Sequence, residues 1–408
     1  TYQRSRAMSG IVIIGAGQAG ASLAITLRAK GYKGDVTLIG EEPVPPYQRP
    51  PLSKKYLLGD MALDRLYLRP SDFYTEQLIS LRLNCQVTTI NCAENTISIG
   101  DETLTYEHLA LTTGSSPRRL PAAIGGTLNG VFAVRSLADV DAMQPAFERG
   151  GHVLIIGGGY IGLEAAAVAA AKGLQVTLVE MANRILQRVA CTETSDYFRA
   201  LHESHGVRIL EGVGLERLTG EGNVTGAILS NGKALEINFA IVGVGILPAT
   251  NLAEAAGVTL NNGIETNSQG QTSVSNVWAA GDCASFPYQG RRIRLESVPN
   301  AIDQAEVVAA NMLGAAQDYI ATPWFWSDQF GVKLQIAGLN TGFTDIIVRN
   351  SGSARSHWYY NSNTLLAVDA MNDPRAYMVA KRLIEAGKSA DPIIVTNPQS
   401  DLKMLLQG

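Results

Sequence analysis

The sequence predicts an α/β fold with two similar halves, followed by a C-terminal α+β domain. Three observations lead to this fold class: a length of 408 residues, two copies of one glycine-containing pattern, and a change in composition near residue 323. At about 150 residues per domain, the length suggests two or three domains. We expect three, with a discontinuous first domain. Their predicted boundaries are 1–114 with 248–322, then 115–247, and finally 323–408.

The composition is that of a globular protein and excludes two classes of function. Apolar residues make up 46% of the chain and charged residues 17%, against a usual value of about 25% for charged residues. The net charge of −4 argues against a dedicated nucleic-acid binder, which would carry a strong basic excess. No apolar run approaches the roughly 18 residues of a membrane span. The apolar stretch from Ile11 is interrupted at Gly15, so we predict no signal peptide, and we expect a cytoplasmic monomer.

The four cysteines, Cys85, Cys92, Cys191 and Cys283, form neither a CxxC nor a CxxxxC pair. A zinc site or a closely spaced redox dithiol is therefore not expected. We predict four reduced thiols and no metal site, since disulfides are rare in the cytosol.

Residues 11–41 and 153–180 are two copies of one pattern. Each copy has a run of β-branched residues and leucine, then GxGxxG, an alanine-rich stretch, and a second apolar run. Continuous apolar runs are typical of buried parallel strands, and alanine favours helix. Each copy therefore predicts a strand–turn–helix–strand unit of the Rossmann-like, dinucleotide-binding type.

The glycines of such a unit have separate tasks. Gly15 allows a tight turn, Gly17 lets the backbone approach a pyrophosphate, and Gly20 permits close packing of helix on strand. The phosphates would lie at the helix N-terminus, where free N–H groups favour anions. The same three tasks fall to the glycines of the second copy, Gly157, Gly159 and Gly162.

The acid at the end of the second strand predicts which nucleotide binds. Glu180 closes the strand of the second copy, where a carboxylate bonds a free ribose 2′-OH and repels a 2′-phosphate, which favours NADH over NADPH. Arg184 follows four residues later, and assistance to a phosphate stays open. In the first copy the equivalent position is Gly40, so we choose Glu41 for the ribose of the other nucleotide.

A later segment indicates that the other nucleotide is FAD. Residues 272–284 read as a strand followed by Gly281 and Asp282, and such an aspartate can bond a ribityl hydroxyl. A helix predicted to begin near Pro299 would direct its N-terminus at the flavin and stabilise negative charge there. Shorter strands are predicted within 86–100, 207–213, 223–245 and 332–340, and a helix near 374–386.

The sequence resembles the FAD-dependent NADH:ferredoxin reductases of bacterial oxygenase systems, such as putidaredoxin-reductase-like and biphenyl-dioxygenase-reductase-like proteins. The matching segments span nearly the whole chain in order: GAGQAG, RPPLSK (49–54), LTTGSSPR (111–118), GGGYIGLE (157–164), GDCA (281–284), ESVPNAIDQA (296–305) and PWFWSDQ (323–329). The resemblance implies a glutathione-reductase-like fold. It also implies a flavoprotein that takes hydride from NADH onto FAD and passes electrons singly to a 2Fe–2S ferredoxin, which supplies a haem-thiolate monooxygenase or a Rieske dioxygenase.

The resemblance also implies site residues. Lys54 is expected as a cation near the flavin, paired with Glu164, which is expected near the nicotinamide. Trp326 is expected over the flavin region, whereas we expect Trp324 to be structural. The predicted FAD contacts are Gly15, Gly17, Ala19, Gly20, Glu41, Arg49, Lys54, Val87, Thr113, Gly114, Arg135, Asp282, Val298 and Trp326. The predicted NADH contacts are Gly157, Gly159, Tyr160, Ile161, Gly162, Glu180 and Gly245.

Other members of the wider fold group are less well supported. Disulfide reductases of this architecture need a CxxxxC motif beside the flavin, and residues 43–59 contain no cysteine. A rubredoxin reductase and a redox signalling protein of the apoptosis-inducing-factor type stay as alternatives. The arginines at 291, 292 and 294 suggest a docking face for an acidic ferredoxin, and Lys54, Lys55, Arg65 and Arg69 form a second basic group.

The histidines carry no recognisable constellation. His202 and His205, in LHESHG, are expected on a helix surface, and no motif connects His108, His152 or His357 to other residues.

Overall fold

The computed structural model describes residues 10–406, which divide into two compact units. The first unit comprises residues 10–48, 62–116 and 247–322, and the second comprises 49–61, 117–246 and 323–406. The segment 49–61 thus belongs with the middle and the end of the chain. The division into three domains at the boundaries given above stays a prediction.

The first unit is built on a seven-stranded sheet with a parallel core. Its strands, in spatial order, are β3 (Ile79–Arg82), β2 (Val36–Ile39), β1 (Gly10–Ile14), β6 (Glu102–Leu111), β5 (Thr96–Ile99) and β4 (Thr89–Asn91), with β18 (Val277–Ala279) also paired to β6. The register aligns Ile14 of β1 with Leu111 of β6, which in turn pairs with Ala279 of β18. Three chain segments therefore leave the sheet at the same edge.

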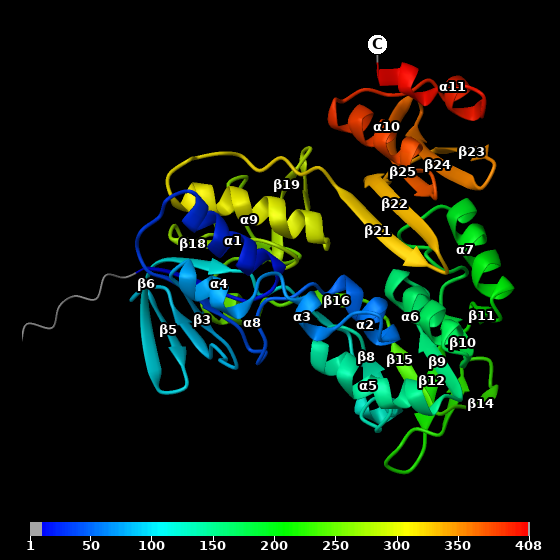
Figure 1. The fold of residues 1–408 in the computed structure, drawn as a ribbon, viewed down its shortest axis with the longest axis horizontal. Helices are drawn as coiled ribbons and strands as arrows, with labels where there is room; N and C mark the ends of the chain where they lie inside the picture. Colours follow the sequence, from blue (N-terminus) through cyan, green and yellow to red (C-terminus); the bar gives the residue numbers. More distant parts are fainter. Residues whose placement is uncertain (1–9, 407–408) are drawn as a thin grey trace, which may run out of the picture. The chain divides into compact units, whose positions relative to one another are not determined.

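Two helices cover this parallel core. α1 (Gln18–Ala29) and α9 (Val298–Met312) pack side by side, as Figure 1 shows in blue and yellow. Leu23 and Leu27 of α1 and Val308 of α9 are fully buried in one apolar cluster with Ile13 of β1. The remaining elements of the unit are short: α3 (Leu63–Leu66), α4 (Ser71–Glu76), α8 (Asn251–Ala255), β17 (Ile264–Glu265), β19 (Ala284–Tyr288) and β20 (Arg291–Ile293).

The second unit contains the other parallel sheet. Its strands, in spatial order, are β11 (Arg208–Glu211), β10 (Gln175–Glu180), β9 (His152–Ile156), β15 (Phe239–Val242) and β8 (Val131–Ala133), all parallel. Ile156 pairs with Val179 and with Val242, so β9, β10 and β15 also end at one edge. The helices of this part are α5 (Leu137–Arg149), α6 (Tyr160–Ala171) and α7 (Thr192–Ser204). Its small elements are η1 (Pro50–Ser53), α2 (Lys55–Leu58), η2 (Ala122–Ile124) and the antiparallel strands β12 (Leu215–Thr219), β13 (Gly226–Leu229) and β14 (Ala234–Glu236).

The C-terminal part of the second unit is an antiparallel sheet with helices. Its strand order is β21 (Trp324–Gln329), β22 (Val332–Gly338), β25 (Thr364–Met371), β24 (Ala354–Asn361) and β23 (Asp345–Ser351). α10 (Pro374–Glu385) begins at Asp373, whose side chain accepts a hydrogen bond from the N–H of Ala376. Short helices α11 (Pro392–Thr396) and η3 (Leu402–Leu406) follow. Trp358 and Tyr360 lie in the core of this part.

These elements confirm the predicted fold class. β7 (Ser115–Pro117) and β16 (Ile246–Pro248) lie where the chain passes between the units, close to the predicted domain ends at 114 and 247. α9 begins at Val298, next to Pro299, where proline predicted a helix start, and α10 begins at Pro374, within the range predicted for a helix. Among the described helices, none is long and apolar enough to cross a bilayer.

Candidate functional site

The first glycine fingerprint forms the turn between β1 and α1. Gly15 has a φ of +113°, and a Cβ there would lie 2.1 Å from the carbonyl oxygen of Thr112. A Cβ on Gly20 would lie 1.9 Å from the carbonyl oxygen of Gly15. Gly17 has an ordinary φ of −91°, and a Cβ there would meet no atom of residues 10–406 within 4 Å, apart from its chain neighbours. Gly15 and Gly20 are thus required by packing, while Gly17 borders open space.

The N-terminus of α1 is suited to an anion. Within the described chain, no side chain caps this helix, and its first turn holds no acidic residue. The first N–H groups of a helix have no partner inside the helix, and the helix dipole favours negative charge there. The open space beside Gly17 therefore adjoins free donors, which fits the pyrophosphate of a dinucleotide.

Further predicted FAD contacts lie near the same sheet edge in the first unit. Asp282 follows β18, and its carboxylate accepts a hydrogen bond of 2.8 Å from the Ser115 hydroxyl. A Cβ on Gly281 would lie 2.9 Å from the Cβ of Ala19 in α1, so Asp282 is held next to that helix. Val298 is the first residue of α9, which Ser297 caps by accepting from the N–H of Asn300.

The remaining predicted contacts of this unit have different surroundings. Thr113 and Gly114 follow β6, and the Thr113 hydroxyl donates to the carbonyl oxygen of Ala249 at 2.6 Å. Glu41 is exposed. An acid at position 40 is excluded because a Cβ on Gly40 would lie 2.7 Å from the Cβ of Ala16. Val87 is buried in the core beside Ile14 and Ile39.

The second fingerprint repeats the geometry of the first. Gly157 has a φ of +110°, and its Cβ would lie 2.3 Å from the carbonyl oxygen of Gly243. A Cβ on Gly162 would lie 2.1 Å from the carbonyl oxygen of Gly157, whereas one on Gly159 would meet nothing within 4 Å in the described chain beyond its neighbours. The N-terminus of α6 again carries no side-chain cap and no acid in its first turn, as far as the chain is described. A second dinucleotide site is therefore built in the same way.

Glu180 lies against this second turn. One carboxylate oxygen accepts a hydrogen bond from the N–H of Gly158 and the other from the N–H of Ala182, both at 2.8 Å. The carboxylate is thus held beside the fingerprint, where a nucleotide ribose would lie. Its charge at this place opposes a 2′-phosphate.

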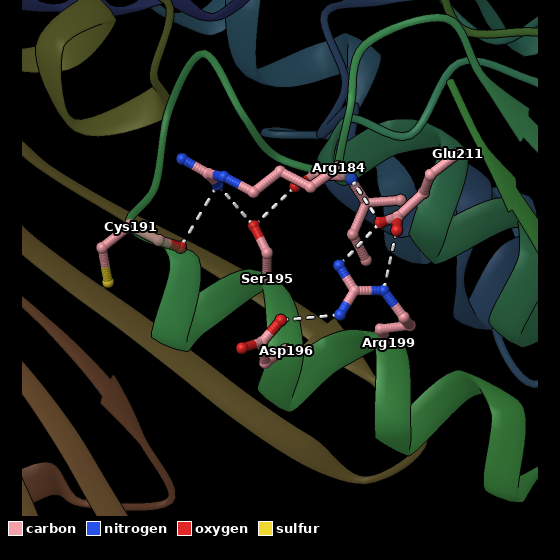
Figure 2. Close-up of polar contacts among 7 residues, drawn as sticks. Arg184, Cys191, Ser195, Asp196, Arg199 and Glu211 are labelled. Carbon is pink, nitrogen blue, oxygen red and sulfur yellow. Dashed lines mark hydrogen bonds and ion pairs between the residues drawn. The ribbon is translucent and has the colours of Figure 1, made fainter. Parts of the chain in front are cut away.

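Arg184, which could have offset that effect, is bound elsewhere (Figure 2). Its guanidinium donates to the Ser195 hydroxyl at 2.6 Å and to the carbonyl oxygen of Cys191 at 3.3 Å. Ser195 in turn donates to the carbonyl oxygen of Ile185, and the N–H of Ile185 donates to Glu211. The loop after β10 is therefore fastened to α7 and β11, and its arginine is directed at α7.

Three further predicted NADH contacts lie around this turn. Tyr160 is the first residue of α6, and its ring packs on Phe325 with centroids 5.1 Å apart. Its hydroxyl is buried, has no hydrogen-bond partner within residues 10–406, and has a raised pKa because of its burial. Ile161 is 42% exposed. Gly245 follows β15 with a φ of +102°.

Lys54 and Glu164 form an ion pair in the second unit. The Lys54 ammonium lies 3.1 Å from Glu164 Oε1 and 3.6 Å from Asp328 Oδ2. Glu164 is 7% exposed and Lys54 lies at the end of η1, so the pair is largely removed from water. Burial raises the pKa of Glu164, and the opposing influence of Lys54 and of the Ser327 hydroxyl is smaller.

The other predicted contacts of this unit are Arg49, Arg135 and Trp326. Arg49 donates to the carbonyl oxygen of Arg135 at 2.8 Å, so these two are brought together. Trp326 lies on β21 beside Trp324, with ring centroids 5.6 Å apart, and both are partly exposed.

Comparison with known proteins identifies the family of this architecture. The pyridine nucleotide-disulphide oxidoreductase family matches residues 9–305, and a reductase C-terminal domain matches residues 324–406. The chain belongs to the pyridine nucleotide-disulphide oxidoreductase family. The first match covers both glycine fingerprints, and the second covers the antiparallel C-terminal sheet.

Within this family the chain is similar over its whole length to named reductases. It is 40% identical to a ferredoxin–NAD(P)+ reductase of Sphingomonas sp. over 401 residues, covering 96% of both chains. It is 38% identical to the putidaredoxin reductase of Pseudomonas putida over 410 residues, covering 98% of this chain and 97% of the other. The reductase chain in the crystal structure of the covalent putidaredoxin reductase–putidaredoxin complex matches with a TM-score of 0.94 and 37% identity, covering 98% and 99%.

The family is named for a disulphide, and the cysteines of this member are all free thiols. Cys191 and Cys283 are buried, and burial raises the pKa of each. A buried thiol of raised pKa is a poor nucleophile. Cys283 lies in the core of the first unit, with Leu111 and Ala279.

The expectation that His202 lies on a helix surface is wrong. His202 is fully buried, because its helix packs against the C-terminal sheet and its ring contacts Gln329 and Phe330. His357, for which the sequence shows no motif, lies in a buried cluster with Cys191 and Asp369, whose potential ligand atoms are within 4.8 Å of one another. Burial lowers the pKa of His202 to about 4 and that of His357 to about 3. Sequence alone gave no sign of this cluster, since its members are up to 178 residues apart in chain order.

Hydrogen bonds account for this cluster. Arg355 donates to Nε2 of His357, so the ring carries its hydrogen on Nδ1 and donates to the Thr194 hydroxyl at 2.7 Å. Thr194 donates to Asp369, as does the Tyr359 hydroxyl. Because the ligand atoms of His357 and Asp369 already have partners, the arrangement does not require a metal. The prediction of no metal site stays a prediction.

The basic residues proposed for docking are partly engaged within the first unit. Arg292 donates to the carbonyl oxygens of Thr266 and Ser285, and Arg294 pairs with Glu296 at 2.6 Å. Arg291 is exposed. The docking hypothesis for this cluster therefore depends mainly on Arg291.

Proposed function

We propose that this protein is an NADH-dependent ferredoxin reductase. It is a flavoprotein that takes two electrons as hydride from NADH onto FAD and delivers them singly to a 2Fe–2S ferredoxin. That ferredoxin supplies an oxygenase, either a haem-thiolate monooxygenase or a Rieske dioxygenase. The observation that carries the proposal is the pair of equally built dinucleotide turns, of which the second holds the Glu180 carboxylate against its backbone. Full-length similarity to ferredoxin and putidaredoxin reductases supports it.

The first fingerprint fits FAD. The open space at Gly17 and the uncapped N-terminus of α1 suit its pyrophosphate, and Asp282 suits its ribityl chain. FAD, when bound, supplies the chemistry that joins a two-electron donor to a one-electron acceptor. Arg49, Lys54, Arg135 and Trp326 are further proposed FAD contacts.

The second fingerprint fits NADH. Gly159 borders the open space for the pyrophosphate, and Glu180 is placed to bond a free 2′-OH. Tyr160, Ile161 and Gly245 lie near the same turn, and the buried hydroxyl of Tyr160 offers an unused polar group.

Lys54 and Glu164 are the proposed catalytic pair. Lys54 places a positive charge near the flavin, where reduction adds negative charge. Glu164 orients the ammonium and balances its charge, because a largely buried charge is costly unless it is paired. Hydride transfer requires no acid–base triad, so positioning and charge are the main tasks of the protein.

We further propose that the protein works in the cytoplasm as a monomer. Support for the location comes from the four unpaired cysteines, which suit a reducing compartment. The monomer is an expectation from the sequence.

Anaerobic stopped-flow spectroscopy of the FAD-loaded protein tests the function. One equivalent of NADH should bleach the flavin band rapidly, and oxidised 2Fe–2S ferredoxin should then restore it as the ferredoxin is reduced. Restoration by rubredoxin alone would make the protein a rubredoxin reductase. Bleaching that persists with every carrier would favour a signalling protein of the apoptosis-inducing-factor type. Bleaching by NADPH and not by NADH would contradict the role given to Glu180.

A further inference from the structure

A line of buried polar side chains runs from Glu164 into the second unit. Ser327 Oγ lies 2.6 Å from Glu164 Oε1, Gln329 Nε2 lies 3.1 Å from Ser327 Oγ, and His202 Nε2 lies 2.8 Å from Gln329 Oε1. Ser327 and His202 are fully buried, and Gln329 is 1% exposed. Buried polar groups are costly unless they are bonded, so such a line needs a reason.

The spacing of helix and strand explains why these residues meet. Tyr160 and Glu164 are one turn apart on α6, about 6 Å along its axis. Phe325 and Ser327 lie on one face of β21, a separation of about 7 Å. Tyr160 contacts Phe325 and Glu164 contacts Ser327, so the two elements stay in register over this length. Gln329 is the next residue on that face of the strand.

The hydrogens of this line all point toward Glu164. Ser327 has one hydroxyl hydrogen and gives it to the carboxylate, so its oxygen accepts from the Gln329 amide nitrogen. The Gln329 carbonyl oxygen then accepts from Nε2–H of His202. Nε2 of His202 therefore carries a hydrogen. Burial lowers the pKa of this ring to about 4, so near neutral pH the ring is uncharged and Nδ1 carries none. Its Nδ1 has no hydrogen-bond partner among the described residues.

This order suits an ionised Glu164 better than a neutral one, because hydrogen bonds to a charged acceptor are the stronger ones. A carboxyl protonated at Oε2, which lies 3.4 Å from the Ser53 hydroxyl, would leave Oε1 as an uncharged and weaker acceptor for the hydrogens of Ser327 and Lys54. Ser327 cannot give its hydrogen to its other partner in the line, because that partner is the NH₂ group of Gln329. The line therefore opposes the effect of burial, which raises the pKa of Glu164. The charged groups facing Glu164 are Lys54 after η1 and Asp328 on β21.

We propose that Ser327, Gln329 and His202 are positioning residues that keep Glu164 ionised and directed at Lys54. They act through Glu164 and do not themselves contact the reacting atoms. The inference rests on the proposed function, because it assigns these residues to the Lys54–Glu164 pair of that reaction. It predicts that loss of any link makes Glu164 easier to protonate.

The test is a pH titration of Glu164 in the FAD-loaded protein, wild type and Ser327→Ala. Carbon-13 NMR of carboxyl-labelled glutamate follows the ionisation, and Glu164→Gln identifies the resonance. A hydrogen bond to a charged group affects the ionisation by about one pH unit or more. The titration midpoint should therefore rise by about that amount in Ser327→Ala. The acid limb of the rate of flavin reduction by NADH should move in the same direction.

Ser356→Ala is the matched control. Ser356 is also a fully buried serine of the C-terminal sheet, and it donates to a different carboxylate, Asp373, at 3.2 Å. It should leave the titration of Glu164 unchanged. Ser327→Thr, which keeps the hydroxyl, should restore the wild-type midpoint. Gln329→Leu should raise the midpoint like Ser327→Ala, and nitrogen-15 NMR should show the Nε2–H form of His202 in the wild type.

The outcomes separate this inference from the function. An unchanged midpoint in Ser327→Ala, or an Nδ1–H form of His202, would overturn the positioning role even if NADH reduces the flavin normally. If NADH does not reduce the wild-type flavin, the proposed function fails. The NMR titration would still show whether the line of hydrogen bonds holds Glu164 ionised.

Discussion

At the scale of single residues, Glu180 has a structural role, beside the recognition role that we propose for it. Its two oxygens bond the N–H groups of Gly158 and Ala182, which fastens the end of β10 to the fingerprint turn. The same bonds place a negative charge where the ribose of a nucleotide would lie. Arg184, the nearby cation, is directed at Ser195 instead.

Replacement of Glu180 by Gln should therefore relax the preference for NADH. Removing the charge lowers the repulsion of a 2′-phosphate, so kcat/KM for NADPH relative to NADH should rise about tenfold, which is equivalent to about 1.4 kcal/mol. Steady-state kinetics with both nucleotides measure this ratio. Arg184→Ala is the control and should leave NADPH use unchanged, because the guanidinium is bonded to α7. A large loss of NADPH activity in that variant would show that Arg184 does reach the phosphate.

At the scale of elements, the three glycines of the fingerprint differ in their surroundings, and they differ in the same way in both strand–turn–helix units. The first and third glycines of each fingerprint lie against backbone carbonyls, so they are needed for folding. The middle glycine has a backbone conformation that any residue can adopt, and open space lies beside it. We propose that its task is to leave room for the ligand.

Gly17→Ala and Gly20→Ala should consequently behave differently. Gly17→Ala should keep the thermal midpoint of the apoprotein and weaken FAD binding, because the added methyl group occupies the approach of the pyrophosphate. Gly20→Ala should lower that midpoint, since its Cβ would lie 1.9 Å from a carbonyl oxygen. Differential scanning calorimetry and flavin titration distinguish the two effects.

Gly159→Ala is the matched variant in the second copy. It should bind FAD normally and raise the KM for NADH. If Gly17→Ala bound FAD like the wild type, the assignment of the first fingerprint to FAD would be wrong.

At the scale of the whole molecule, buried polar networks and surface charge have separate consequences. The Cys191–His357–Asp369 cluster joins α7 to the C-terminal sheet inside the second unit. The net charge of −4 is small, so attraction to an acidic partner depends on local basic groups.

Asp369 should make stability depend on pH. Burial raises its pKa to about 6 in the folded protein, from 3.8. The folded state therefore binds the proton more tightly, and the contribution of Asp369 to stability is greatest below about pH 4 and falls as the pH rises to about 6. This group should lower the free energy of unfolding by about 3 kcal/mol over that range. Asp369→Asn should remove this part of the pH dependence, as measured by the thermal midpoint.

The exposed aspartate Asp64 provides the comparison, and Asp64→Asn should retain the wild-type pH dependence. An identical slope in Asp369→Asn and wild type would mean that Asp369 does not take up the proton.

Substitution of Arg291 should affect the reaction with ferredoxin and leave the reaction with NADH unchanged. Charge reversal in Arg291→Glu should raise the KM for an acidic ferredoxin several-fold at low salt and weaken its salt dependence, because complementary charge mainly accelerates association. Flavin reduction by NADH should not change. Arg208→Glu alters an exposed arginine on β11 and is the control. Equal effects of both variants would indicate a general charge effect without a docking role for Arg291.

Much of the fold follows from local patterns in the sequence. The spacing of Gly15, Gly17 and Gly20, and its repeat from Gly157, predicted both strand–turn–helix units, because a tight turn and a close helix each demand glycine at a set position. Proline at 299 predicted the start of α9. The choice of NADH was predicted from Glu180, a residue at the end of its own strand.

Only the tertiary structure decided which distant side chains meet. His202 was expected on a surface, and the C-terminal sheet that buries it begins more than a hundred residues later. The line from His202 through Gln329 and Ser327 to Glu164 depends on the packing of α6 and α7 against β21, which no local pattern encodes. Likewise, Gly40 excludes an acid because Ala16 approaches it from another segment. Sequence alone determined the turns and the nucleotides, since these depend on neighbouring residues. The burial and bonding of the polar groups were decided by contacts between segments far apart in the chain.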